Sequence, residues 1–577
     1  MEKWEQKVWI GGMSESPYGL EPAKRIQRER LGNYTVLFNG PWTPEQVREV
    51  GEFCRRKGMR FVMDEMIDRL DGTVTSRYRP MKEKVLEALS PYRDVLDGSL
   101  LLCEYGGLMF YWPQSTVDQS PMLAGEVRDF REAERHAVER MRKTIAYAQE
   151  EGVPGPFICI EAGGMTAPAL FRAGIGRVDL EVTYNSELER NYSALKGACL
   201  AFGKEKFGVD MAMVWYGGNQ HDFLWERRWR TSLFHAFLRG ANPIYAEHGV
   251  MDYRALGKEY GADHPQVQRF CAVLRQAAEY AAGHPRPKGL PKAVIGVVQG
   301  RLDGFVGMGQ THLWGQREKD EYRIGNAERS WELFERFYRR RSWENRERFG
   351  EVDYSGNPPL GQVDVLPYDA PVELLSNYRA LLFLGRNSMD DGLYQRLVDY
   401  VRQGGQLLMT AAHMDSAVSP QGAFKPYLDG DWSELFGVRM RNGEASKPVY
   451  GVKFREEPAC GWRFPLWSPN CDPKFTDGGF PAACLERVDG SVLAVASDRF
   501  ADGSWSEEMQ GVLYCKEQGT GCAILLNSLE YPGAEGVKGL YGFLMDACCE
   551  ANQVYPKVEC SDRVRFACYA APNGDFS

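Results

Sequence analysis

Short apolar runs recur along the first 250 residues of the chain, and amphipathic stretches separate most of them. Apolar runs of this length, bounded by helical segments, are typical of strands in a parallel sheet. Because strand and helix alternate eight times, the pattern predicts a (β/α)8 TIM barrel over residues 1–288. The runs are Lys7–Gly11, Tyr34–Asn39, Arg60–Asp64, Leu100–Glu104, Pro156–Glu161, Val178–Tyr184, Val209–Trp215 and Pro243–Glu247.

Most segments between these runs have the apolar spacing of a helix. The predicted helices are Pro44–Lys57, Met81–Leu89, Glu126–Glu151, Ser186–Gly203, Phe223–Gly240 and a closing helix at Gly261–Gly283. A segment rich in proline and basic residues, His284–Lys292, follows and is typical of a linker. The barrel is therefore expected to end there.

The alternation resumes after the linker with fewer elements, which favours an open sheet over a second barrel. Predicted strands are Ala293–Gln299, Gly361–Leu366, Arg379–Gly385 and Gly405–Thr410, with helices at Ala327–Arg341 and Asp390–Arg402. We expect a flavodoxin-like, doubly wound α/β domain with inserted loops over residues 289–555. No glycine-rich phosphate loop follows these strands, so a structural or oligomerising role is favoured. Residues 556–577 could begin a β-rich C-terminal domain such as a β-sandwich.

Three glutamates, Glu104, Glu161 and Glu247, end apolar runs and precede a glycine within three positions. The carboxyl ends of the strands form the active face of a TIM barrel. Two carboxyl groups there are enough to hydrolyse a glycoside. Glu161 and Glu247 end the fifth and eighth runs, so they are expected to face each other across the barrel mouth. We therefore predict Glu161 as general acid/base and Glu247 as nucleophile, with Glu104 as the third candidate.

Other polar and aromatic residues fall near predicted strand ends, where a sugar would be bound. Carboxylates and amides suit its hydroxyl groups, and aromatic rings suit its apolar face. Each of these residues also has a plain structural interpretation, as a loop residue, an ion-pair partner or part of the core. The candidate substrate-binding residues are Asp64, Glu181, Tyr184, Asn185, Trp215, Tyr216 and His248. His248 or Tyr216 is expected to keep Glu247 ionised.

The composition excludes several classes of function. Net charge is −9 with acidic and basic residues well mixed, so no nucleic-acid partner is expected. No apolar stretch predicts a signal peptide or a membrane span. The 14 cysteines form no C-x-x-C pair, and no H-E-x-x-H is present. We therefore expect a cytoplasmic, reduced protein with no metal site and no cofactor.

Three segments resemble family 42 β-galactosidases of glycoside hydrolase clan A. They are Cys54–Glu65, Leu100–Gly107 and Ser232–Gly249, similar to that family's third strand, its fourth-strand N-E-Y-G segment, and the helix and strand that end its barrel. The resemblance implies Glu104 as acid/base, a flavodoxin-like trimerisation domain and a homo-oligomer, in particular a trimer. The β-mannosidases of family 164 are similar to the same three-domain plan.

The chain departs from the family 42 pattern at two points. The family has an asparagine directly before its acid/base, but here Cys103 precedes Glu104 and Ile160 precedes Glu161. The segment that corresponds to the family's nucleophile strand, Met211–Gly218, carries no glutamate. The expected function is a retaining, exo-acting glycoside hydrolase on small β-glycosides, either β-galactosides or β-mannosides. Two alternatives stay open: a carboxylate- or metal-dependent lyase or isomerase on sugars, and a catalytically inactive sugar-binding barrel.

Overall fold

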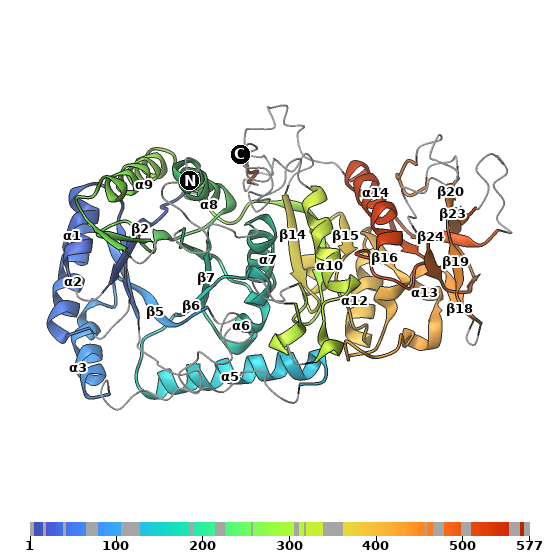
Figure 1. Ribbon diagram of the computed structural model, residues 1–577, viewed down its shortest axis with the longest axis horizontal. Coiled ribbons are helices and arrows are strands. Elements are labelled where there is room, and N and C mark those ends of the chain that lie inside the picture. The colour runs from blue at the N-terminus through green and yellow to red at the C-terminus, as the bar shows by residue number, and fades with distance from the viewer. Residues whose placement is uncertain are drawn as a thin grey trace.

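A closed barrel of eight parallel strands forms the N-terminal half of the computed structural model (Figure 1). Its strands are β2 (Ile10–Glu15), β3 (Tyr34–Phe38), β4 (Arg60–Asp64), β5 (Leu96–Cys103), β6 (Phe157–Glu161), β7 (Arg177–Glu181), β8 (Gly208–Met211) and β9 (Ile244–Ala246). One helix follows each strand: α1 (Glu21–Arg28), α2 (Pro44–Lys57), α3 (Arg79–Leu89), α5 (Phe130–Glu150), α6 (Ala167–Ala173), α7 (Leu188–Ala201), α8 (Trp225–Arg239) and α9 (Pro265–Gly283). The predicted TIM barrel is confirmed.

The structure describes residues 5–15, 19–38, 42–64, 79–104, 127–183, 188–213, 225–255, 258–304, 311–316, 319–337, 362–441, 444–455, 459–464, 478–497, 509–552 and 566–569. Within them, no helix has both the length and the apolar character needed to cross a bilayer.

Local sequence signals fix the ends of α2 as predicted. Thr43 caps its first turn: the Thr43 hydroxyl accepts from Gln46 N at 3.2 Å, and the Gln46 side chain accepts from Thr43 N at 2.9 Å. Pro44 opens the helix with a backbone angle already suited to it. Gly58 ends it in the left-handed region, with φ at 64°.

The first barrel strand lies later in the chain than predicted, at Ile10–Glu15 instead of Lys7–Gly11. The strand contains two glycines, Gly11 and Gly12, and the neighbouring strand approaches Gly11 too closely for a side chain. A Cβ added at Gly11 would lie 1.7 Å from Tyr34 O. The predicted run ends at Gly11, whereas the strand continues through Gly12 to Glu15.

A polar network fills the N-terminal end of the barrel interior. Arg177 forms an ion pair with Asp97, and its Nε lies 2.6 Å from Asp179 Oδ1. Tyr34 and Tyr245 complete the network: Tyr34 donates to Asp97 at 3.0 Å, and Tyr245 donates to Asp179 at 2.9 Å. Burial alone would raise the pKa of Asp97, but Arg177 and Lys206 lower it to about 2. The N-terminal end of the barrel interior is thus filled by buried side chains of opposite charge that form ion pairs with one another.

The second domain is built on an eight-stranded sheet with the order β14-β13-β15-β16-β25-β24-β23-β20. The strands are β13 (Ala293–Gln299), β14 (Gln362–Pro367), β15 (Ala380–Phe383), β16 (Gln406–Thr410), β20 (Val452–Phe454), β23 (Ser491–Ala496), β24 (Gly511–Gln518) and β25 (Gly521–Leu526). The first five in this order are parallel and the last three antiparallel. The parallel part has the strand order of flavodoxin-like sheets. Assignment to the doubly wound class stays a prediction.

Short helices and strands complete this domain. The helices are α10 (Asn326–Arg329), α11 (Val372–Leu375), α12 (Asp391–Arg402), α13 (Ser433–Phe436) and α14 (Glu535–Ala551). Two small sheets combine β17 (Asp431–Trp432), β18 (Val438–Met440) and β22 (Leu485–Arg487), and β19 (Lys447–Val449) with β21 (Phe480–Ala482). The helix predicted at Ala327–Arg341 is instead α10 followed by a 3-10 turn, Ser330–Phe337, and its last residues lie outside the described part.

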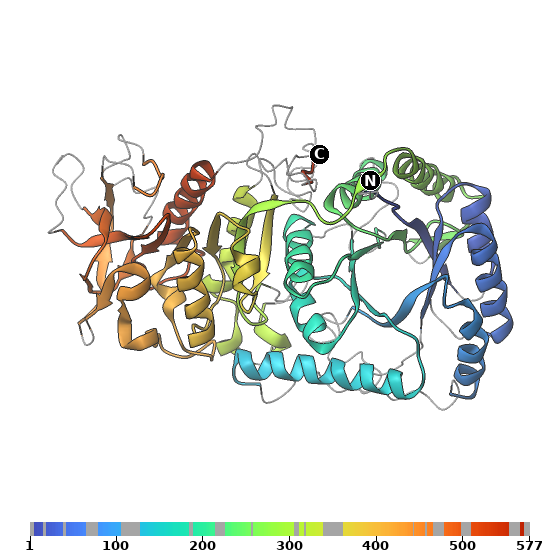
Figure 2. The same cartoon turned by 180° about the vertical axis from the view of Figure 1, so that it is seen from behind.

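Helix α7 belongs to the barrel and also packs on the second sheet, as Figures 1 and 2 show from opposite sides. Gly197 allows the close approach, because a Cβ there would lie 1.8 Å from Val365 O of β14. At the preceding residue, Lys196 Nζ lies 2.9 Å from Asp364 Oδ1, with both side chains buried. The two domains therefore share one continuous packed boundary.

Smaller elements lie at the ends of the barrel. The predicted linker contains β12 (Arg286–Pro287), which pairs with β1 (Glu5–Gln6). A hairpin of β10 (Asp252–Ala255) and β11 (Lys258–Gly261) precedes α9. In residues 556–577 the described part is 566–569, where Tyr569 donates to Leu238 O at 3.1 Å. The rest of the predicted β-rich start lies outside the described residues.

Candidate active site

Four carboxylic acids meet at the C-terminal end of the barrel. Glu104 follows β5, Glu181 ends β7, Asp210 lies on β8 and Glu247 follows β9. Their charges act on one another: those of Glu104, Glu247 and Asp210 each raise the pKa of Glu181. The structure therefore brings together two of the three predicted catalytic glutamates, one predicted substrate-binding residue and one unpredicted aspartate.

Glu104 reaches this group because its backbone is not extended. Strand register pairs Cys103 with Ile160, whose side chain belongs to the apolar cluster inside the barrel. Strict alternation would then turn Glu104 toward the helices. Its φ of 51° is left-handed, uncommon for a residue other than glycine, and turns the side chain to Glu181 instead. Such conformations persist where the surroundings enforce them, and they cluster at functional sites.

The carboxyl groups of Glu104 and Glu181 share a hydrogen bond, which requires a proton on one of them. Burial raises the pKa of Glu181 well above its usual range, and the charges of Glu104 and Glu247 raise it further. Burial also raises the pKa of Glu104, although the hydrogen bond from Glu181 lowers it. Glu181 therefore holds the shared proton and donates the hydrogen bond, which Glu104 accepts.

Two carboxyl oxygens at this site, Glu181 Oε2 and Asp210 Oδ1, are buried with no hydrogen-bond partner among the described residues. Burial, and then the charge of Glu247, raise the pKa of Asp210 well above its usual range. An unsatisfied buried polar atom costs about 1–3 kcal/mol, so such atoms call for an explanation. Both oxygens are suited to accept or donate a hydrogen bond to a polar ligand.

Glu247 has the predicted neighbour. His248 Nε2 lies 3.4 Å from Glu247 Oε1, and both side chains are almost fully buried. The contact places His248 beside Glu247, and the role predicted for it there stays a prediction.

Glu161 lies elsewhere. Ile158 and Ile160 of β6 point into the barrel, and Cys159 belongs to the cluster between strands and helices. By the same alternation Glu161 faces the helices, where its fully buried carboxylate accepts from Gly163 N at 3.1 Å. The structure therefore does not bring Glu161 together with Glu247.

The remaining predicted substrate-binding residues divide into two groups. Asp64 ends β4 and alternates with Val62, an inward residue, which places it at the barrel mouth. Tyr184, Asn185, Trp215 and Tyr216 lie outside the described residues.

Solved glycoside hydrolases share this fold over nearly the whole chain. A β-galactosidase from Bacillus circulans sp. alkalophilus matches with a TM-score of 0.60 at 12% identity, covering 98% of this chain and 92% of its own. A β-galactosidase from the haloarchaeon Halorubrum lacusprofundi gives 0.56 at 14% identity, covering 95% and 90%. An exo-β-1,4-mannosidase from Opitutaceae bacterium strain TAV5 gives 0.52 at 13%, covering 96% and 97%. The chain has the fold of these enzymes.

The resemblance to the family 42 plan is thereby confirmed at the level of the fold, with low sequence identity. No family model matches the chain, and no curated protein matches it. The function must therefore be argued from the site, since one barrel fold hosts many chemistries.

Sequence reasoning missed Asp210 because it lies inside an apolar run rather than at its end. The signal was present: Asp210 is an acidic residue between Val209 and Met211, both of which face the helices. A charged residue on the inward face of a barrel strand is costly to bury unless it has a partner or a function. With Asp210 included, the site holds two carboxyl groups, Glu181 and Asp210, whose pKa burial raises well above the usual range, and Glu247 lies beside His248. Two carboxyl groups in different environments can share the work: the protonated one donates a proton to one atom, and the ionised one stabilises positive charge on another.

Proposed function

We propose that the protein is a retaining β-glycoside hydrolase in which Glu104 is the general acid/base and Glu247 the nucleophile. The observation that carries the proposal is the convergence of Glu104, Glu181 and Glu247 at the barrel mouth. The fold shared with β-galactosidases and a β-mannosidase supports the same reaction class. Glu104 takes the acid/base role that strand spacing predicts for Glu161.

Glu104 suits the acid role because a general acid must hold its proton near neutral pH. Burial and the charge of Glu247 favour its protonated form. In the first step Glu104 protonates the glycosidic oxygen as the bond to the anomeric carbon breaks, and the carboxylate of Glu247 bonds to that carbon. In the second step Glu104 removes a proton from water, which displaces Glu247 with a second inversion.

Glu181 would position the acid rather than react. Its proton, donated to Glu104, fixes the orientation of that carboxyl group. Its second oxygen, Oε2, and Asp210 Oδ1 are available for sugar hydroxyls. Small exo-cleaved β-galactosides or β-mannosides are the proposed substrates, because the enzymes of similar fold are named for them.

The test compares Glu104→Gln and Glu247→Gln with Glu161→Gln on aryl β-galactosides and β-mannosides. Loss of the acid/base or nucleophile should lower kcat by about 10²–10⁴-fold or more. Azide should restore turnover in Glu104→Gln on substrates with a good leaving group, giving a β-glycosyl azide. Glu161→Gln is the matched control, since that buried glutamate faces the helices, and should keep kcat close to wild type. Wild-type kcat in either of the first two variants would remove that residue from the mechanism.

The alternatives have different outcomes in the same experiments. Turnover that requires an added divalent ion and yields an eliminated or isomerised sugar would favour the carboxylate- or metal-dependent lyase or isomerase. Saturable binding of a monosaccharide without any turnover would favour the inactive sugar-binding barrel.

Assembly and location also belong to the proposal. We propose a homotrimer through the second domain, as the family 42 resemblance implies, and a cytoplasmic location, as the cysteine pattern implies. Sedimentation equilibrium tests the first, and a monomeric mass would contradict it. Fractionation of the native source tests the second.

A further inference from the structure

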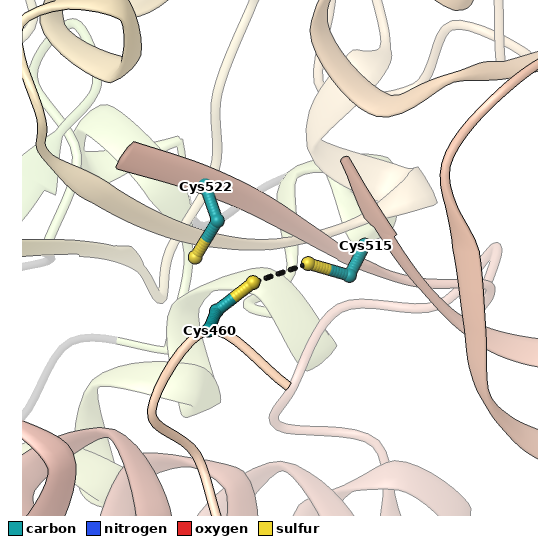
Figure 3. Close-up of side chains that lie close together, drawn as sticks. All are labelled: Cys460, Cys515 and Cys522. Atoms are coloured by element: carbon teal, nitrogen blue, oxygen red, sulfur yellow. Dashed lines mark hydrogen bonds between the residues drawn. The ribbon is translucent and has the colours of Figure 1, made fainter. Parts of the chain in front are cut away.

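Three cysteine side chains converge on the second sheet, at the end of the molecule away from the barrel (Figures 1 and 3). Cys460 lies on the loop after β20, Cys515 on β24 and Cys522 on β25. Their sulfur atoms all lie within 4.8 Å of one another, and Cys460 Sγ is 2.8 Å from Cys515 Sγ. Among the described residues, these three cysteines are the one group of at least three potential metal ligands whose ligand atoms lie this close together.

The strand register builds half of the cluster. β24 and β25 pair antiparallel, and Glu517 lies opposite Cys522. Cys515 lies two residues before Glu517, so both fall on one face of β24. Two thiols and one carboxylate therefore share one face of a hairpin.

The loop supplies the third thiol from above this face. Cys460 has a φ of 54°, a left-handed conformation that is uncommon for cysteine. Two contacts hold it there: Gln406 donates to Cys460 O at 3.0 Å, and Trp462, fully buried, donates to Gln406 Oε1 at 2.7 Å. The loop is thus anchored by groups other than the sulfur atoms.

The solvent side carries a possible fourth ligand. Glu517 Oε1 lies 3.4 Å from Cys460 Sγ, and Glu517 is exposed while Cys515 and Cys522 are buried. An ion can therefore enter from the side of Glu517. Three sulfurs and one oxygen from three chain segments match the four-coordinate sites that zinc prefers.

We propose that Cys460, Cys515 and Cys522 bind one zinc-like divalent ion as thiolates, with the Glu517 carboxylate or a water molecule completing the coordination. Thiolate ligands select soft or borderline ions such as Zn²⁺ over Mg²⁺ or Ca²⁺. Each thiol releases its proton to solvent on binding. The ion would join the loop at Cys460 to the β24–β25 hairpin, so its role is structural. Cys460 and Cys515 are 55 residues apart in the sequence, and Cys515 and Cys522 are 7 apart, so the site has no C-x-x-C pattern by which the sequence could predict it.

The test measures zinc by mass spectrometry in the full-length protein purified under reducing conditions from zinc-containing medium. Wild type should carry about one zinc per chain, and Cys460→Ser, Cys515→Ser and Cys522→Ser should each lose most of it. Cys484→Ser is the matched control: this partly buried cysteine of the same domain lies outside the cluster, and it should keep the metal. Cobalt in place of zinc should give a thiolate charge-transfer band that Cys460→Ser abolishes.

Zinc-free wild type that also takes up no cobalt would overturn the proposal. So would a Cys460–Cys515 disulfide in freshly purified protein, identified by non-reducing peptide mapping. If Cys515→Ser or Cys522→Ser fails to fold, Cys460→Ser decides, because its residue lies on a loop anchored by Gln406. Equal zinc content in Cys460→Ser and wild type would contradict the proposed ligand set.

Discussion

Glu181 donates a hydrogen bond to Glu104 across the mouth of the barrel, so one proton joins the ends of β7 and β5. The contact exists because Glu104 adopts a left-handed backbone conformation at the end of its strand. This contact places the buried carboxyl group of Glu181 next to Glu104, the proposed catalytic acid. The consequences for pH dependence can be measured.

Replacement of Glu181 by glutamine should stabilise the protein at neutral pH. Burial raises the pKa of Glu181 well above its usual range, so the folded state holds a proton that the unfolded state releases above about pH 4.3. Folding then becomes less favourable by about 1.4 kcal/mol per pH unit while that difference persists. Thermal melts of wild type and Glu181→Gln from pH 4 to pH 8 should show a gap in Tm that opens as pH rises. A gap that is constant with pH would contradict the raised pKa.

Activity should respond differently to two substitutions of Glu181. The hydrogen bond from Glu181 lowers the pKa of Glu104, so its loss in Glu181→Met should raise that pKa further. The basic limb of the kcat/KM profile should then move to higher pH. Glutamine can still donate to Glu104, so Glu181→Gln should move the limb less than Glu181→Met. Identical profiles for the two variants would show that the hydrogen bond does not set the pKa of the acid.

The network at the opposite end of the barrel should be essential for stability. Arg177→Met would leave Asp97 and Asp179 buried without their main cation, at a cost of about 3–5 kcal/mol. Arg439→Met is the control, because Arg439 pairs with Asp431 on the surface, where such pairs contribute about 0–1 kcal/mol. Urea denaturation of both variants tests this. Equal losses would contradict the assigned role of the buried pair.

The Asp97 carboxylate should make the stability of the protein depend on pH under acidic conditions. Its pKa of about 2 lies below the unfolded value of about 3.9, so its contribution is complete above pH 4 and is lost as pH falls toward 2. The Tm of wild type should therefore fall more steeply between pH 4 and pH 2 than that of Arg177→Met. Parallel curves in this range would contradict the shift.

The boundary between the domains can be tested through its buried ion pair. Lys196→Met would leave the buried Asp364 without this cation, although Tyr378 would still donate to it, and should cost about 3–5 kcal/mol. Adding Asp364→Asn removes the uncompensated charge, so the double variant should recover part of the loss. Thermal melts of the single and double variants decide, and a double variant no more stable than Lys196→Met would show that the charge is not the cause.

The sequence was sufficient for the barrel because its strands are short apolar runs separated by helices with clear caps, as at α2. It was less reliable at β2, which continues through Gly12 to Glu15, beyond the end of the predicted run at Gly11. The antiparallel strands β23 and β24 lie among turn-rich segments whose pairing depends on distant residues.

The site was harder to predict, because side-chain direction at a strand end depends on one backbone angle. Glu104 follows β5 and Glu161 ends β6, and alternation alone would turn both toward the helices. A left-handed φ at Glu104 reverses its direction, and nothing in the local sequence specifies that angle. For Glu161, burial on both faces of β6 concealed which face the last residue occupies.

The most direct test of the account is to trap the covalent intermediate with 2-deoxy-2-fluoro-β-galactosyl and β-mannosyl fluorides and map the label by peptide mass spectrometry. We predict time-dependent inactivation by one of the two reagents and a label on Glu247. A label on Glu104, Glu161 or Glu181, or turnover with inversion and no label, would contradict the assignment of Glu247 as nucleophile.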